Sequence, residues 1–218
     1  MRILLISSSP HEKRSATYSL AAKIAEGAKA AGAEVETVHL AGRKLQFCHA
    51  CEACHRAHMT CHLKDDAHQI ILKMLNSDGL IFAAPNYLNQ VPAQLKTLMD
   101  RTSNLIHCQR LLGKYAAGAV TSGSGNNESV GAYLGDYARL CGAQYVGTAG
   151  SGPEPGRKEL DAAFALGGRL AADIKEGSVY APQAREIEQR RAYFAEIVKR
   201  RKSDWDGEFH YYSEKGWL

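Results

Sequence analysis

Short apolar runs separated by helical patterns constrain the fold of this 218-residue chain more than any other feature of its sequence. The runs at residues 2–6, 79–84 and 115–121 are continuously apolar or small, which is typical of strands buried on both faces of a parallel sheet. Residues 34–40 alternate in polarity and are rich in β-branched side chains, as expected of a strand towards a sheet edge. Residues 144–147 supply a fifth predicted strand.

Helical patterns alternate with these strands. An alanine-rich stretch ends near Ala31 and Gly32, where glycine supplies the stop. Further helices are predicted over residues 67–76 and 92–104, from Asn127 to about Leu140, and over residues 159–176. This alternation predicts an α/β fold, a doubly wound five-stranded parallel sheet with helices on both faces.

The bulk properties fit one domain with appendages rather than two full domains, because 45% hydrophobic residues in a chain of this length can bury one sizeable core. The apolar run Met1–Ile6 turns polar at Ser7, too soon for a signal peptide or a membrane span, so we expect a cytoplasmic protein with no membrane partner. The net charge of +4 is mild, and its excess near residues 185–202 indicates one exposed helix and no nucleic-acid partner.

Four of the six cysteines lie within fourteen residues, in the spacing Cys48-x2-Cys51-x2-Cys54-x6-Cys61. This spacing is close to the thiolate runs that ligate iron–sulfur clusters, although no proline follows the last cysteine. A 4Fe-4S cluster is the favoured interpretation. Two alternatives stay open: a zinc site completed by nearby histidines, or free or disulfide-forming thiols. The histidines in question are His49, His55, His58 and His62.

Three polar loops follow predicted strands, and in an open parallel sheet ligands bind beyond the carboxyl ends of the strands. The first loop contains the candidate ligand-binding residues Ser7, Ser9, Pro10, His11, Lys13, Arg14, Ser15, Ala16 and Thr17. The second contains Pro85, Asn86, Tyr87, Leu88 and Asn89. The third contains Thr121, Ser122, Gly123, Ser124, Gly125 and Asn126.

The first loop can direct backbone N–H groups, hydroxyls and a helix N-terminus at a phosphate, with Lys13 or Arg14 adding charge. The alternative is a simple helix cap, but a cap needs one hydroxyl and five hydroxyl residues lie between Ser7 and Thr17. The second loop offers an aromatic ring and amides, and the glycines of the third allow close approach to a flat ring. A phosphate with a flat heterocycle describes FMN. No dinucleotide-binding glycine motif or P-loop occurs.

In their order and spacing these features resemble the flavodoxin-like NAD(P)H-dependent FMN reductases, especially their iron–sulfur flavoprotein branch. The likeness covers about residues 2–150 and rests on Ser9–Pro10, Ser15, Thr17, the four cysteines, Asp65–Asp66, Ala84–Tyr87, Leu95–Lys96 and Asp100–Arg101. It implies strand order 2-1-3-4-5, the FMN phosphate in the loop 9–17, the isoalloxazine between residues 85–89 and 121–126, and a 4Fe-4S cluster on the four cysteines. His11 stands where the family usually has arginine, which leaves Lys13 or Arg14 for the phosphate.

Two functions are compatible with these features. The first is an FMN-dependent oxidoreductase that passes electrons from NAD(P)H or ferredoxin to a quinone, flavin, metal, oxygen or protein acceptor. The second is a non-catalytic electron carrier, or a zinc-holding interaction module, on the same sheet. No constellation of side chains predicts an acid or base, and His107, His210, Cys108 and Cys141 are expected to be structural. Because the cysteines follow the second strand, we expect them on the same rim of the sheet as the FMN.

The chain changes character after residue 181, so we predict a flavodoxin-like domain at 1–181, with a cysteine-rich insert at 45–66, and a C-terminal tail at 182–218. The tail has an amphipathic basic helix over residues 186–201, followed by Trp205, Phe209, Tyr211, Tyr212 and Trp217. So many aromatic side chains at a terminus predict docking, either on the parent domain or on another subunit. We expect the tail to contact a neighbour in a homodimer or homotetramer.

Overall fold

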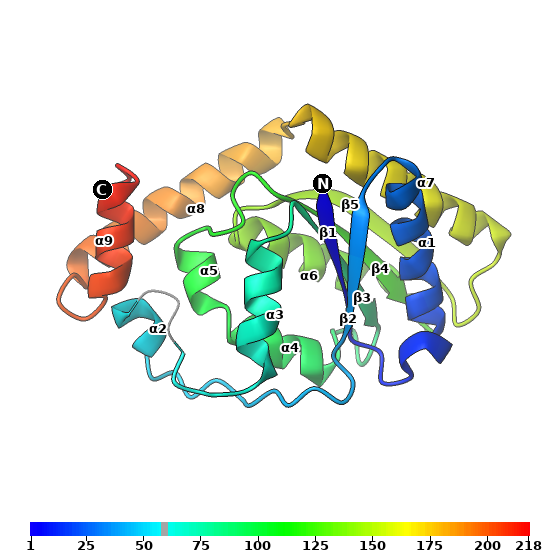
Figure 1. Ribbon diagram of the computed structural model, residues 1–218, viewed down its shortest axis with the longest axis horizontal. Coiled ribbons are helices and arrows are strands. Elements are labelled where there is room, and N and C mark those ends of the chain that lie inside the picture. Colours follow the sequence, from blue (N-terminus) through cyan, green and yellow to red (C-terminus); the bar gives the residue numbers. More distant parts are fainter. Residues whose placement is uncertain (58–60) are drawn as a thin grey trace.

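The computed structural model describes residues 1–57 and 61–218 (Figure 1). Its centre is a sheet of five parallel strands in the order β2-β1-β3-β4-β5, which confirms the predicted flavodoxin-like topology. The strands are β1 (Arg2–Ser7), β2 (Glu34–His39), β3 (Gly79–Pro85), β4 (Tyr115–Thr121) and β5 (Gln144–Ser151). Pro85 lies opposite Thr121 and Ser7 opposite Ala83, so the three predicted ligand loops leave the sheet at one rim.

Helices cover both faces of the sheet (Figure 1). α1 (Ala16–Ala30) and α7 (Arg157–Glu176) pack on one face, where Ile3 and Leu5 of β1 are buried. The other face buries Leu4 and Ile6 beneath α3 (Asp66–Leu75), α4 (Ala93–Asp100), α5 (Ser103–His107) and α6 (Asn127–Leu140). Alternate side chains of β1 therefore enter two separate cores, which is why residues 3–6 are all apolar.

α1 and α7 approach so closely that glycine is required where they cross. A Cβ atom added at Gly167 would lie 1.9 Å from the carbonyl oxygen of Ile24, and one added at Gly27 would lie 1.9 Å from that of Phe164. Such distances are possible only without a side chain, because the two backbones themselves are in contact. This crossing fixes the helix layer that carries the first ligand loop at the start of α1.

Three boundaries differ from the sequence prediction. The helix expected over residues 92–104 is two helices, α4 and α5, and the break falls at Thr102, whose buried hydroxyl donates to the Met99 carbonyl. β5 continues to Ser151, because it pairs with β4 as far as Thr121 beyond an irregularity in the register. In the tail, a helix forms over Asp206–Glu214 (α9), where the sequence predicted aromatic docking without an element.

The tail packs on its own chain. α8 (Ala181–Arg200) runs away from the sheet, and α9 lies beside the short helix α2 (Ala53–Arg56) of the cysteine segment (Figure 1). Trp205 and Tyr212 are buried with Cys108 in a third apolar cluster, so these two rings need no second subunit to cover them. Of the two docking partners left open by the sequence, the parent domain is the one these aromatic side chains contact.

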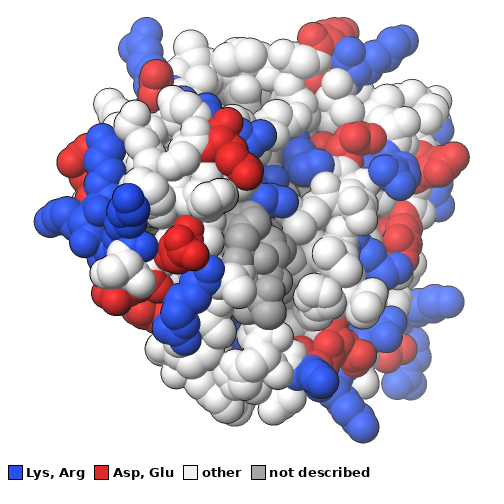
Figure 2. All heavy atoms as spheres, turned by 60° about the vertical axis from the view of Figure 1, so that its left-hand side comes forward, with Lys and Arg blue, Asp and Glu red and all other residues white. Residues whose placement is uncertain are grey.

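The basic side chains of the tail are partly neutralised by acidic neighbours. Arg190 pairs with Glu186 at 2.8 Å and Lys199 with Glu196 at 3.0 Å. Both signs of charge are interspersed on the side of the molecule that carries the tail (Figure 2). Among the described helices, none is both long enough and apolar enough to span a bilayer.

Candidate flavin site and cysteine pocket

The first ligand loop is organised around the N-terminus of α1. Ser15 caps this helix, and its Oγ accepts the backbone N–H of Tyr18 at 3.3 Å. The Thr17 hydroxyl lies 2.5 Å from the Thr121 hydroxyl, which joins the first loop to the third. Ser9, Ser15 and Thr17 are all buried. The loop therefore presents hydroxyls and the free N–H groups of a helix start at the rim of the sheet.

Four of the predicted residues in this loop are exposed to solvent, and Pro10 is one of them. His11, Lys13 and Arg14 are exposed, the last two on a short 3-10 helix over Glu12–Arg14. The Oγ atom of Ser7, at the end of β1, is buried and has no hydrogen-bond partner among the described atoms. Cationic side chains, an unused buried hydroxyl and a helix N-terminus form a donor set that suits a phosphate.

The second and third loops are held together by amide side chains. Asn86 donates to the carbonyl of Asn126 at 2.9 Å, and Asn126 donates to Asn89 Oδ1 at 2.7 Å. Leu88 and Asn89 have positive φ angles of 53° and 60° in a tight turn closed by Tyr87 and Gln90. This turn leaves the Leu88 side chain 99% exposed, so an apolar surface borders the site.

The glycine loop leaves room for a planar group. Gly125 has φ +78°, a conformation that favours glycine, and a Cβ atom added there would meet nothing within 4 Å. Ser122, by contrast, is buried, and its hydroxyl lies 3.0 Å from the Ser124 hydroxyl. This hydrogen bond orders the loop. With the phosphate donors of the first loop, an open glycine backbone and the exposed side chains of Tyr87 and Leu88, the residues present fit FMN.

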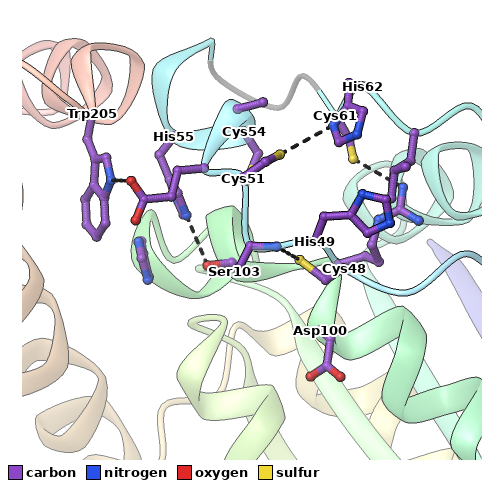
Figure 3. A pocket seen from close by; sticks show the side chains of 16 residues that line it. Cys48, His49, Cys51, Cys54, His55, Cys61, His62, Asp100, Ser103 and Trp205 are labelled. Atoms are coloured by element: carbon purple, nitrogen blue, oxygen red, sulfur yellow. Dashed lines mark hydrogen bonds between the residues drawn. The ribbon is translucent and has the colours of Figure 1, made fainter.

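The four predicted metal-ligating cysteines line one pocket of about 310 Å³ (Figure 3). The cysteine segment leaves β2 at the rim where the ligand loops lie and runs outward to α2 (Figure 1). The pocket wall combines this segment with α4, α5 and the tail, and its lining is Cys48, His49, Ala50, Cys51, Glu52, Ala53, Cys54, His55, Cys61, His62, Leu63, Asp100, Arg101, Ser103, His107 and Trp205. All four thiols are free, so the disulfide alternative is not what this structure contains.

The backbone between the cysteines is tightly coiled. Ala50 and Glu52 have positive φ angles of 51° and 58°, which turn the chain between successive thiols. The Ala50 N–H donates to Cys48 Sγ at 3.4 Å, and Cys51 Sγ lies 3.4 Å from His62 Nδ1. A segment that curls its thiols towards one pocket is what a metal centre with several cysteine ligands requires.

The thiols are not closely grouped in this structure. Tetrahedral zinc with Zn–S bonds of about 2.3 Å places its sulfur atoms roughly 3.8 Å apart. Among the described residues, the group of three ligand atoms within 4.8 Å of one another is His55, His107 and Glu208, and no three of the four thiols form such a group. His58, one of the histidines considered for zinc, lies outside the described residues. The cluster and the zinc site both stay predictions for these cysteines.

A buried arginine faces the last cysteine. Arg101, directly after α4, donates from Nη2 to Cys61 Sγ at 3.3 Å and from Nη1 to Asp65 Oδ2 at 2.7 Å. Burial alone would raise the pKa of Asp65, but hydrogen bonds from Arg101 and from the Gln46 and Ala67 N–H groups hold this pKa below its usual value. Asp65 also caps α3, and its side chain accepts the Ala67 N–H. The pair thus fixes a positive charge next to a candidate ligand.

The tail contributes a carboxylate that sequence reasoning did not find. Glu208 of α9 is fully buried and accepts hydrogen bonds from His55 Nδ1 at 2.5 Å and His107 Nδ1 at 3.1 Å. Burial opposes protonation of His55, yet its hydrogen bonds to Cys54 and Glu208 raise its pKa to about 10. The three residues come from α2, α5 and α9, and no periodicity or spacing in the sequence connects them.

Fold and site together define a flavodoxin-like flavoprotein with a cysteine pocket on the segment that follows β2. Residues 1–151 match the model of the NADPH-dependent FMN reductase family, and the chain belongs to this family. It is an FMN-dependent oxidoreductase.

Comparisons with individual proteins agree with this family and with the flavodoxin-like fold. The chain is 29% identical over 223 residues to an iron–sulfur flavoprotein of Archaeoglobus fulgidus, with all of both chains covered. It is 38% identical over 126 residues to an iron–sulfur flavoprotein of Methanosarcina thermophila, which covers 58% of this chain and 64% of that one. A solved archaeal flavodoxin superposes with a TM-score of 0.58 at 14% identity, over 80% of this chain and 99% of the other, and shows the shared fold.

Proposed function

We propose that this protein uses FMN in the three rim loops and a 4Fe-4S cluster on Cys48, Cys51, Cys54 and Cys61 to move electrons from NAD(P)H or ferredoxin to a small-molecule or protein acceptor. The observation that carries the proposal is the convergence of four free thiols on one pocket in a segment that leaves the sheet at the flavin rim. FMN, when bound, accepts electrons in pairs and releases them singly, whereas a cluster carries one.

Each part of the chain has a defined role in this proposal. The loop from Ser9 to Thr17 would hold the phosphate, with the N-terminus of α1 supplying N–H donors. The Asn86–Asn126–Asn89 hydrogen bonds would hold the second and third loops together, so that both loops border the same flat ring. Arg101 and the Ala50 N–H would donate to cysteine sulfur atoms. Membership of a reductase family favours this enzyme over the non-catalytic carrier or zinc module.

Anaerobic purification tests the proposal directly. The expected preparation has flavin absorption bands and about four iron and four sulfide per chain, as a cubane requires. It oxidises NADH or NADPH, and a comparison of the two gives the donor. One zinc per chain, or no metal after anaerobic reconstitution with iron and sulfide, would contradict the cluster. Reduction by ferredoxin without any turnover of NAD(P)H would assign the donor to a protein.

We also propose a homodimer or homotetramer, although Trp205 and Tyr212 are covered within the chain. The support is the apolar surface that remains in solvent: Tyr193 of α8 is 63% exposed and Phe47, next to the first cysteine, is 74% exposed. Light scattering of the full chain should give a mass of two or four subunits, and Tyr193→Glu should lower that mass. A monomer at micromolar concentration would contradict the proposal.

A further inference from the structure

Glu208 is a buried charge whose position the proposed chemistry does not by itself explain. It lies in the first turn of α9, in a tail that belongs to neither the sheet nor the flavin loops. Its carboxylate accepts from His55, His107 and also from Asn104 Nδ2 at 3.2 Å. A buried carboxylate is tolerated only with several such donors. Both oxygens of the Glu208 carboxylate therefore have hydrogen-bond donors, which indicates a specific arrangement of these side chains.

A mononuclear metal site is one explanation for this group, since two histidines and a carboxylate are a common ligand set. The ring geometry opposes it. The imidazoles of His55 and His107 are stacked at 4.7 Å with only 13° between their planes. Ring nitrogen lone pairs lie in the ring plane, so two nearly parallel stacked rings cannot both point at one ion. Each oxygen of the Glu208 carboxylate also accepts a hydrogen bond from an imidazole Nδ1. Glu208 therefore forms a hydrogen-bonded bridge between His55 and His107.

The bridge ends on the helix that carries a cysteine. α2 has only four residues, too few to be stable alone, and includes both Cys54 and His55. Asn104, which donates to Glu208, also donates to the Cys54 carbonyl at 3.2 Å. The side chain and the backbone of this short helix are thus tied to the same buried carboxylate.

A second contact ties the start of α2 to the tail. Glu52 precedes α2 and accepts from both terminal nitrogens of Arg201, at 3.1 and 2.8 Å, and from Trp205 Nε1 at 3.1 Å. The Trp205 ring then stacks on His55 at 4.7 Å (Figure 3). The tail therefore contacts this segment on both sides of Cys54, at Glu52 and at His55.

We propose that Glu208 is a positioning residue of the metal centre: from α9 it holds α2 so that Cys54 faces the pocket, and the tail is thereby a structural part of the cluster site. This inference rests on the proposed 4Fe-4S cluster. Residues that orient metal ligands typically change metal affinity or activity by about 10–100-fold when they are replaced. The carboxylate acts through His55 and Asn104 and touches no ligand atom itself.

The test compares Glu208→Ala and Glu208→Gln with Glu214→Gln, an exposed glutamate on the same helix. Each full-length variant is purified anaerobically and reconstituted, and iron transfer to a ferrous chelator is timed. We expect release roughly tenfold faster for Glu208→Ala, an intermediate rate for Glu208→Gln, which keeps an acceptor oxygen, and no change for Glu214→Gln. The electron paramagnetic resonance spectrum of the reduced cluster should change only in the Glu208 variants.

A second measurement separates failure of this inference from failure of the cluster itself. If the wild-type chain takes up no iron, the proposed cofactor is wrong. Hydrogen exchange of the metal-free full chain still decides the role of Glu208, because exchange across residues 52–57 should accelerate in Glu208→Ala while exchange in β1 and β3 stays slow. Wild-type iron release and an unchanged spectrum in both Glu208 variants, or unchanged exchange in α2, would overturn the inference.

Discussion

The flavin loops and the cysteine pocket are built in opposite ways. Each flavin loop directly follows a buried strand, and the sheet register alone brings the loops to one rim. The cysteine pocket takes its wall from residues 48–55 and 61–63, the end of α4, α5 and Trp205 of the tail. A ligand site supported by the sheet inherits the rigidity of the core. A site assembled from a short helix and a distant tail depends on side-chain contacts, such as those of Arg101 and Glu208.

The largest expected effect tests whether the flavin site is independent of the pocket. Ser15→Asp should abolish FMN retention, because a carboxylate at the start of α1 repels the phosphate. Aspartate is itself a good N-cap, so the helix should remain folded. Flavin absorption of the purified protein measures the loss, and iron content should be unchanged. Ser19→Asp, exposed on the same helix, is the control and should keep its flavin.

The converse change removes a thiol from the pocket. Cys54→Ser should eliminate most of the iron while FMN stays bound, since a serine hydroxyl replaces a thiolate ligand poorly. Iron and sulfide analysis together with the flavin spectrum gives both readings on one sample. Cys141→Ala serves as the control, because Cys141 is buried in the core beside Tyr137 and away from the pocket. Loss of flavin together with iron in Cys54→Ser would show that the two sites are coupled.

A substitution in the shared scaffold should affect both regions together. Gly167→Ala inserts a methyl group 1.9 Å from the Ile24 carbonyl and should lower the free energy of unfolding by about 1–3 kcal/mol. Gly168→Ala, its neighbour in α7, meets no atom within 4 Å and should be neutral or stabilising by about 0.5–1 kcal/mol. Urea denaturation of the two variants measures the difference, and equal stabilities would contradict the close crossing of α1 and α7.

The smallest effect concerns the electronic environment of the pocket. Arg101→Gln removes a positive donor from Cys61 and should lower the reduction potential of the cluster without a change in that of the flavin, because hydrogen bonds to sulfur stabilise the reduced state. Anaerobic spectroelectrochemical titration resolves the two potentials. Arg101→Gln with Asp65→Asn leaves no unpaired buried carboxylate and no change in net charge, so it should give a smaller shift in the same direction. A shift in the flavin alone would refute this assignment.

The sequence correctly predicted the elements of the fold that depend on a local pattern of residues. Five strands, their order and the loops after them follow from apolar runs such as residues 79–84 and from the resemblance at Ser9–Thr17, and the structure confirms the sheet. The cysteine spacing predicted a common metal site, and the four cysteines line one pocket, while the metal itself stays a prediction. The break at Thr102 was missed because a side-chain hydrogen bond overrides helical periodicity there. The Glu208 bridge was missed because a contact between residues 55 and 208 leaves no periodic signal in either segment.

The contacts between the tail and α2 also set the order in which the flavin loops and the cysteine pocket form during synthesis. Chains fold from the N-terminus as they emerge from the ribosome, and all five strands precede residue 152. The flavin loops can therefore form while Arg201, Trp205 and Glu208 are still untranslated, and the thiols stay without the support of the tail until these residues are made. We expect ribosome-stalled chains that end before residue 201 to bind FMN yet lose iron to a chelator, which places stable metal insertion after flavin binding.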